Sequence, residues 1–238
     1  AGELNGRYIS RKKRSIQMIQ QIEADDCIVV GKERLELYPY AEKGRPFFFH
    51  PNSAMFRIKR LLNGEQDPFI HAACLEAGTS ILDCTLGLAS DSIVASFVVG
   101  KKGKVTGIEG NPYIAYIVKS GLKSWKSSSS EINKAMERVE VKNKLSLPYL
   151  KSLPDNSYDC VYIDPMFEEN ILNADGIQAL KRFAVYSEIT QEFVDEATRV
   201  ARKRVIMKDH FRSLRFEKFK FYVYRRKTAT FHFGVIEK

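Results

Sequence analysis

The sequence predicts an α/β fold: a mostly parallel sheet covered by helices, preceded by a small α+β region. Three observations lead to this prediction. After residue 66, short apolar runs alternate with segments of helical periodicity, which is typical of right-handed βαβ units. Residues 219–237 contain two β-rich runs around a basic turn, which indicates an antiparallel hairpin at one edge of the sheet. Before residue 66 the pattern is mixed. We therefore expect a small α+β N-terminal domain at residues 1–66 and a Rossmann-like domain at residues 67–238.

The N-terminal region combines one helix, a strand pair and a basic helix. Residues 15–22 have helical spacing, with Ser15 as the predicted N-cap. Two short strands about a Gly-Lys turn are expected within residues 26–38. Residues 45–62 then predict an aromatic strand, a turn and a basic amphipathic helix.

In the Rossmann-like domain, short apolar strands are separated by helical segments. The strands are expected within residues 80–86, 104–110, 138–146, 158–165 and 203–210. The helices are expected within residues 90–100, 112–125, 132–139 and about 189–202, with Pro112 in the first turn of its helix.

The composition favours a folded protein with a polyanionic partner. Hydrophobic residues make up 44% of the chain, enough for a sizeable core, and the formal net charge is +9. This excess favours nucleic acid or an acidic membrane surface, with an ordinary basic protein as the alternative. No apolar run is long enough to span a bilayer and no signal peptide opens the chain, so we expect a cytoplasmic protein. The four cysteines form no Cys-x-x-Cys pair and no histidine has zinc-finger spacing, so neither a metal site nor a disulfide is expected.

Candidate ligand-binding residues stand at the ends of the first two strands of this domain. Asp83 precedes a turn that contains Gly87, and Glu109 ends the next strand. Ligands of open α/β sheets bind at the carboxyl ends of strands, and a carboxylate at the second strand is placed to accept ribose hydroxyls. The three-glycine dinucleotide fingerprint is missing, so a nicotinamide cofactor fits poorly. A ligand with a ribose, an adenine and a positive centre but no pyrophosphate fits S-adenosylmethionine.

Three motifs, LDCTLGLASDS, GIEGNP and YIDPMF, resemble the first, second and fourth motifs of class I methyltransferases. More narrowly, they resemble the small-subunit rRNA (guanine-N2) methyltransferase J family of bacteria. SAMFRIKRLLNGE and KRVIMK are also similar to segments of that family, so the resemblance extends with gaps over residues 47–208. It implies a Rossmann-like class I methyltransferase sheet, S-adenosylmethionine as cofactor and RNA as substrate.

The same resemblance implies which residues surround the cofactor. Ser90 and Asp91 would lie beside its methionine end, and Glu109 and Gly110 would hold the ribose and flank the adenine. The full set implied for cofactor binding is Asp83, Thr85, Gly87, Ser90, Asp91, Glu109, Gly110, Ser146 and Asp164. The chain departs from the wider fold at one place. After the third strand that fold often has an acidic or polar residue beside the adenine, whereas this chain offers only Asn143, Lys144, Leu145 and Ser146, so the adenine contact is left open.

The Asp-Pro-Met-Phe run at the end of the fourth strand is suited to methylating an exocyclic base amine. Asp164 and the Pro165 carbonyl are spaced to accept hydrogen bonds from the two N–H groups of such an amine, which would localise its lone pair towards the methyl group. Pro165 stiffens the turn, and Phe167 is expected to stack on the unpaired base. We therefore predict Asp164, Pro165 and Phe167 as catalytic residues. The alternative is a strand-ending turn with Phe167 packed in the core.

Several basic residues are candidate RNA contacts. Arg57, Lys59 and Arg60 lie beside apolar residues before the sheet, and Lys208 and His210 follow the fifth strand. Together they would form a salt-sensitive RNA footprint. The alternative for each is an ordinary solvated side chain.

Three other functions stay open at this point. The scaffold would also serve a methyltransferase that acts on a protein carboxylate or a small molecule. A non-catalytic RNA-binding module would bind RNA without cofactor. A nucleotide-dependent oxidoreductase fits least well.

Overall fold

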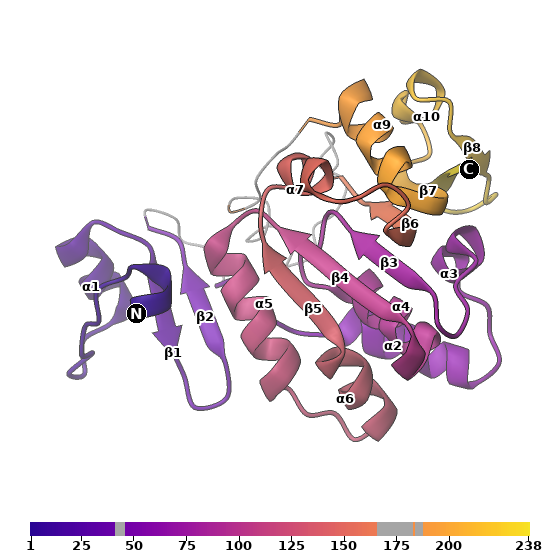
Figure 1. The fold of residues 1–238 in the computed structure, drawn as a ribbon. Helices are drawn as coiled ribbons and strands as arrows, with labels where there is room; N and C mark the ends of the chain where they lie inside the picture. Colours follow the sequence, from indigo (N-terminus) through magenta and orange to yellow (C-terminus); the bar gives the residue numbers. More distant parts are fainter. Residues whose placement is uncertain (41–45, 166–182, 184–187) are drawn as a thin grey trace.

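The structure is a computed structural model that describes residues 1–40, 46–165, 183 and 188–238. Its main element is a seven-stranded sheet in the order β5-β4-β3-β6-β7-β9-β8 (Figure 1). The strands of this sheet are β3 (Ser80–Asp83), β4 (Lys104–Glu109), β5 (Val139–Asn143), β6 (Tyr158–Ile163), β7 (Ala201–His210), β8 (Tyr222–Tyr224) and β9 (Phe231–Glu237). The predicted α/β sheet is therefore confirmed.

Strand direction follows the predicted pattern. The strands β3 to β7 pair in parallel, with β3 between β4 and β6. The closing hairpin is antiparallel: β9 pairs with β7 on one side and with β8 on the other. Counted by their appearance within the sheet, the strands run 3-2-1-4-5-7-6. The order reverses at β3, which makes its carboxyl end a topological switch point.

Helices cover both faces of the sheet. One apolar cluster is built from α2 (Asn52–Leu62), α3 (Pro68–Ala73), α4 (Ser90–Val99), α5 (Pro112–Ser124) and α6 (Ser130–Glu137). A second cluster contains residues of α7 (Ser146–Ser152), α9 (Gln191–Val200) and α10 (Arg215–Lys218). Adjacent residues of β3 divide between them, since Ile81 lies in the first cluster and Leu82 in the second. This alternation buries both faces of the central strand.

Local capping signals explain where several helices begin. The Ser15 side chain accepts from Met18 N–H at the start of α1 (Ile16–Glu23), as predicted. Asn111 accepts from Tyr113 N–H, and Pro112 occupies the first turn of α5. These caps satisfy backbone N–H groups that have no partner within their own helix.

The N-terminal residues place a short hairpin beside α5 (Figure 1). Its strands are β1 (Cys27–Val30) and β2 (Leu35–Tyr38), and a 3-10 turn, η1 (Gly2–Leu4), opens the chain. The predicted aromatic strand after residue 45 is wrong: Phe47 forms a single bridge with Leu37. Phe47 and Phe49 are buried instead, and the Phe49 ring lies where a Cβ on Gly121 of α5 would be.

The basic helix before the sheet is part of the main core. Ala54 and Ile58 of α2 are fully buried in the same cluster as α4. The division of the chain at residue 66 stays a prediction.

One predicted boundary moves. Helix α9 ends at Val200, not near residue 202, and β7 begins at Ala201. Ala201 has extended backbone angles and pairs with Tyr158 of β6, so strand pairing ends the helix. A second 3-10 turn, η2 (Gly100–Lys102), follows α4.

Candidate functional site

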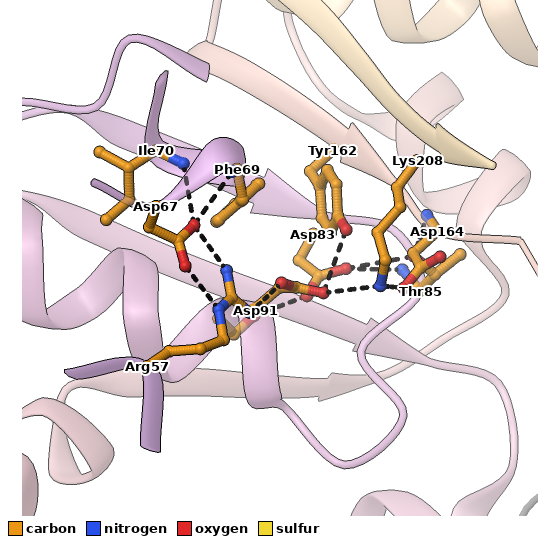
Figure 2. Close-up of polar contacts among 11 residues, drawn as sticks. Arg57, Asp67, Phe69, Ile70, Asp83, Thr85, Asp91, Tyr162, Asp164 and Lys208 are labelled. Atoms are coloured by element: carbon orange, nitrogen blue, oxygen red, sulfur yellow. Dashed lines mark hydrogen bonds and ion pairs between the residues drawn. The ribbon is translucent and has the colours of Figure 1, made fainter. Parts of the chain in front are cut away.

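The carboxyl ends of β3, β4, β6 and β7 meet at one edge of the sheet. The strand β3 lies between β4 and β6, so the chain continues towards one edge of the sheet after β3 and towards the other edge from β6 on. In sheets of this kind ligands bind outside the carboxyl end of the strand where the order reverses. Charged and polar side chains from the ends of β3, β6 and β7 and from the helices beside them converge here (Figure 2).

The turn after β3 is held close to β4. Leu86 N–H donates to Ile108 O at 3.0 Å, and Ala89 N–H donates to Leu86 O at 2.7 Å. Gly87 and Ala89 have φ values of +47° and +60°, so the chain reverses within a few residues before α4 starts. Gly107 of β4 makes room for this turn, since a Cβ there would lie 2.3 Å from Leu86 Cδ1.

The buried carboxyl group of Asp83 stabilises that turn through two hydrogen bonds. Its Oδ1 accepts from Thr85 N–H at 2.9 Å, and its Oδ2 accepts from the Ser92 hydroxyl at 2.7 Å. Burial raises the pKa of Asp83 to about 7, although both hydrogen bonds oppose the shift. A cation bound nearby would favour the ionised form of this carboxyl group.

Asp91, in the first turn of α4, is the centre of an ion-pair network. Its Oδ1 accepts from Arg57 Nη1 at 2.5 Å, and its Oδ2 accepts from the Tyr162 hydroxyl at 3.0 Å. The Lys208 ammonium lies 3.5 Å from the same Oδ2. Lys208 and Arg57 hold the pKa of Asp91 well below its usual range despite its burial.

Arg57 joins this network to α3. Its Nε and Nη2 donate to Asp67 Oδ2 and Oδ1 at 2.7 and 2.9 Å, a bidentate pair. Asp67 Oδ1 also accepts from Phe69 N–H at 3.0 Å and so caps α3. The guanidinium therefore lies between two carboxylates, and both raise its pKa.

Asp164 follows the last residue of β6 and pairs with Lys208 of β7. The Lys208 ammonium donates to Asp164 Oδ2 at 2.6 Å. Asp164 Oδ1 is buried and has no hydrogen-bond partner among the residues that the structure describes. Burial, opposed by the Lys208 ammonium, raises the pKa of Asp164 to about 6. Asp164 N–H donates to Thr85 Oγ1 at 2.7 Å, which ties this strand end to the turn after β3.

Glu109 occupies the neighbouring strand end. It is 9% exposed, and its Oε1 accepts from Asn111 N–H at 2.9 Å. Burial raises the pKa of Glu109, while the backbone N–H groups of Asn111, Gly87 and Gly110 act in the opposite direction. Because Gly87 belongs to the turn after β3, the Glu109 carboxyl group stands between two strand ends.

Asn143 and Ser146 hold the end of β5 against the same region. Asn143 Nδ2 donates to the carbonyls of Glu109 and Gly110 at 2.8 and 3.1 Å. The Ser146 hydroxyl donates to Cys84 O at 2.6 Å.

The structure thus gathers most of the predicted cofactor residues at one edge. Asp83, Thr85, Asp91 and Asp164 are linked directly or through Lys208, and Ser90 opens α4 beside them. Glu109, Gly110 and Ser146 lie at the adjoining ends of β4 and β5. Of the predicted catalytic residues, Phe167 lies outside the described residues.

The predicted RNA contacts fall into two groups. Arg57 and Lys208 are part of the ion-pair network, with side chains 19% and 23% exposed. Lys59 and Arg60 lie on the exposed side of α2, where Arg60 pairs with Glu65 at 2.7 Å. His210 is the last residue of β7, and the centroid of its ring lies 4.5 Å from that of the Phe211 ring.

Sequence reasoning missed three members of the site: Asp67, Ser92 and Tyr162. Tyr162 is 1% exposed and reads in the sequence as an ordinary core aromatic. Asp67 before Pro68 carried an N-cap signal that would have placed it at a helix start. The contact of Asp67 with Arg57 and that of Tyr162 with Asp91 depend on how α2, α3, α4 and β6 pack, which no local pattern reveals.

The charge of the site fits a cationic cofactor. Three carboxyl groups, those of Asp67, Asp91 and Asp164, pair with the two cations Arg57 and Lys208. A fourth, that of Asp83, is buried beside them and hydrogen-bonds to Thr85 and Ser92. The cluster is therefore negative when all of them are ionised. S-adenosylmethionine carries a sulfonium, and the buried carboxyl group of Glu109 at the end of the second strand is an acceptor suited to ribose hydroxyls.

The fold and its charged switch point define a class I methyltransferase. The chain belongs to a family described as "Putative SAM-dependent methyltransferase", which matches residues 11–229. It is therefore an enzyme that uses S-adenosylmethionine, as predicted.

The chain is similar in sequence to two curated proteins and in fold to a solved structure. It is 49% identical over 235 residues to "Uncharacterized protein YpiP" of Bacillus subtilis, covering 99% of this chain and 91% of that one. It is 29% identical over 192 residues to "Ribosomal RNA small subunit methyltransferase J" of Legionella pneumophila, covering 78% and 74% of the two chains. The SAM-dependent methyltransferase NGO1261 of Neisseria gonorrhoeae shares the fold, with a TM-score of 0.62, 18% identity, and coverage of 90% and 83%.

Two negative findings apply to the described part of the chain. No helix there is long and apolar enough to cross a bilayer. No cluster of three or more His, Cys, Asp or Glu side chains there is arranged to hold a metal ion.

Proposed function

We propose that this methyltransferase modifies an exocyclic amine of an RNA base, with guanine N2 of small-subunit ribosomal RNA as the leading substrate. The acceptor geometry of Asp164 is the main support. Lys208 occupies Oδ2, and the buried Oδ1 has no partner among the described residues. A buried acceptor without a partner costs free energy, which a substrate N–H would recover.

An exocyclic amine is a weak nucleophile because its lone pair is delocalised into the ring. Asp164 Oδ1 accepts a hydrogen bond from one N–H group of the amine, and the Pro165 carbonyl accepts one from the other. These two bonds localise the lone pair on the nitrogen, towards the methyl group. Bound S-adenosylmethionine supplies an activated methyl group on its sulfonium. The nitrogen loses one proton when it is methylated, and Asp164, with a pKa of about 6, accepts that proton.

The proposal assigns the cofactor to the neighbouring strand ends. Glu109 accepts the ribose hydroxyls and Gly110 flanks the adenine. Ser90 and Asp91 stand at the methionine end. Asp83, Thr85 and Gly87 shape the turn that approaches the cofactor, and Ser146 anchors the start of α7 against that turn.

RNA contacts extend the site outward. Lys59 and Arg60 on α2 and His210 at the end of β7 contact the phosphate backbone. Arg57 and Lys208 act mainly through Asp91 and Asp164, since both cations are already paired there. The stacking of Phe167 on the base rests on the Asp-Pro-Met-Phe motif alone. The net charge of +9 and the name of the Legionella relative support RNA as the substrate class.

Labelled-methyl transfer tests the proposal. Ribosomal subunits from a strain that lacks this enzyme are incubated with the protein and methyl-labelled S-adenosylmethionine, and label in RNA is compared with label in protein. We expect label in the small-subunit RNA, in a nucleoside that behaves as N2-methylguanosine. Asp164→Asn should lower the rate at saturating cofactor about 10²- to 10⁴-fold.

The matched control is Asp195→Asn, since Asp195 is an exposed carboxylate on α9 far from the strand ends in the sequence. It should leave the rate unchanged. Label found in protein and not in RNA would refute the substrate class. Full RNA methylation by Asp164→Asn would refute the role of Asp164.

A further inference from the structure

A groove of about 700 Å³ lies between the start of α3 and the closing hairpin. Phe233 of β9 forms its buried floor, and His71 of α3 and Tyr222 and Tyr224 of β8 stand along its walls. In Figure 1, α3 and β8 are seen on the side of the sheet opposite the N-terminal hairpin. We call this the aromatic groove.

Its rings are held by one another. Tyr222 and Tyr224 have ring centroids 5.5 Å apart at an angle of 87°, and His71 and Tyr224 lie 5.6 Å apart at 89°. Tyr222 is nevertheless 71% exposed. Ordered aromatic rings at a surface lose little conformational entropy when a flat partner stacks on them.

One end of the aromatic groove is cationic. Arg225 and Arg226 line it, Lys227 follows them, and all three are exposed. Within the described part of the chain, none of the three forms an ion pair. The acidic residue of the groove, Asp67, is 8% exposed and its carboxylate is occupied by Arg57. The groove thus presents uncompensated positive charge next to aromatic rings, which is the chemistry that binds single-stranded nucleic acid.

The aromatic groove adjoins the candidate active site on the same face of the sheet. Phe233 pairs with Lys208 of β7 on one side and with Tyr224 of β8 on the other. Directly opposite residues in antiparallel strands point to the same face. Two strand spacings, about 10 Å, therefore separate the backbone of Lys208 from that of Tyr224. Nucleotides next to a base held at Asp164 are within reach of the groove.

We propose that the aromatic groove binds the single-stranded RNA that flanks the target base, with Tyr222 as a stacking platform and Arg225 and Arg226 as phosphate contacts. This inference rests on the proposed RNA substrate. It gives the closing hairpin a role in substrate binding, apart from the cofactor and the methyl acceptor.

Two variants test the groove in the full-length protein. Tyr222→Ala removes the exposed ring, and Arg225→Ala with Arg226→Ala removes two charges. Tyr8→Ala, at a ring that is 80% exposed, and Lys101→Ala with Lys102→Ala, at η2, are the matched controls. The probe is a short fluorescein-labelled single-stranded RNA of mixed sequence, read by anisotropy at several salt concentrations. Methyl transfer to ribosomal RNA is measured in parallel.

Tyr222→Ala should weaken RNA binding about 5- to 100-fold. The double arginine variant should lower the salt slope by about 1.4. In methyl transfer both should raise KM for RNA with kcat and cofactor affinity unchanged, and the controls should match wild type. Groove variants that bind the probe like wild type, or a wild type that binds no RNA, would overturn the inference. A wild type that binds RNA through the groove but transfers no methyl to it would refute the proposed function and leave the groove standing.

Discussion

The Lys208 ammonium lies 2.6 Å from Asp164 Oδ2, and Asp164 Oδ1 has no hydrogen-bond partner among the described residues. The two residues come from neighbouring parallel strands, β6 and β7, at their carboxyl ends. One oxygen of the carboxyl group is thus paired with a cation, and the other is the acceptor that the proposed mechanism offers to the substrate. Several predictions about pH, cofactor affinity and stability depend on this pair and its neighbours.

Lys208→Met should change the pH dependence of methyl transfer. Removing the ammonium raises the pKa of Asp164 from about 6, because the cation is what opposes the effect of burial. The acidic limb of kcat/KM should therefore move to higher pH, with a loss of about 10- to 100-fold at pH 7. Lys203→Met, an exposed lysine on the same strand, is the control and should keep the wild-type profile. An acidic limb that stays near pH 6 in Lys208→Met would contradict the assignment.

Affinity for S-adenosylmethionine should rise with pH more steeply than affinity for S-adenosylhomocysteine. The pKa values of Asp83 and Asp164 are about 7 and about 6, so both carboxyl groups gain negative charge across this range. A cation binds better to the ionised forms, and the two ligands differ by the sulfonium charge. Calorimetry below pH 6 and above pH 7 measures the difference. Parallel pH curves for the two ligands would show that these carboxyl groups do not sense the sulfonium.

Glu109→Gln should weaken S-adenosylmethionine binding about 10- to 100-fold, the cost of losing hydrogen bonds to a charged acceptor. The backbone should stay in place, because a glutamine oxygen still accepts from Asn111 N–H. Calorimetry measures the change. Glu137→Gln, an exposed glutamate at the end of α6, is the control and should bind like wild type. Undiminished affinity in Glu109→Gln would remove Glu109 from the cofactor site.

Arg57→Met should destabilise the protein by about 3–5 kcal/mol, because it leaves the carboxylates of Asp67 and Asp91 buried without their shared cation. Arg60→Met on the same helix breaks the exposed pair with Glu65 and removes the guanidinium from over the Phe56 ring, and should cost no more than about 2 kcal/mol. Urea unfolding monitored by circular dichroism gives both values. Adding Asp91→Asn to Arg57→Met should recover part of the loss. Equal effects of the two arginine variants would show that burial of the network adds nothing.

Asp83→Asn should flatten the pH dependence of stability in the cofactor-free protein. The pKa of Asp83 is about 7 in the folded state against an ordinary value of 3.8, so the folded state binds more protons between these limits. Stability attributable to Asp83 therefore falls as pH rises from about 4 to 7. The variant should be more stable than wild type at pH 8 by an amount on the order of 1–3 kcal/mol. Unfolding curves at pH 5 and pH 8 measure this, and identical slopes for the two proteins would contradict it.

Local signals were enough to locate most elements. Ser15 and Pro112 each mark a helix start that the structure reproduces, since capping depends on a few adjacent residues. The strands of the main sheet were predicted from their short apolar runs, and the structure explains these runs because the strands are buried on both faces. The strand predicted for the aromatic run after residue 45 is wrong because only Phe47 pairs, in a single bridge with Leu37, while Phe49 packs against α5. The composition of that run supports either outcome.

The sequence by itself determined which residues end the strands, since Asp83, Glu109 and Asp164 each follow or close an apolar run. Because the carboxyl ends of parallel strands lie at the same edge of a sheet, these residues were expected together there. Only the tertiary structure decided their partners. Arg57 and Asp91 are 34 residues apart in the chain, and Asp164 and Lys208 are 44 apart. Such pairs form because strand order and helix packing bring distant segments together, and no pattern of a few residues encodes that. The pKa values and the orientation of Asp164 follow from these pairings, so the chemistry of the strand ends depends on the folded chain as a whole.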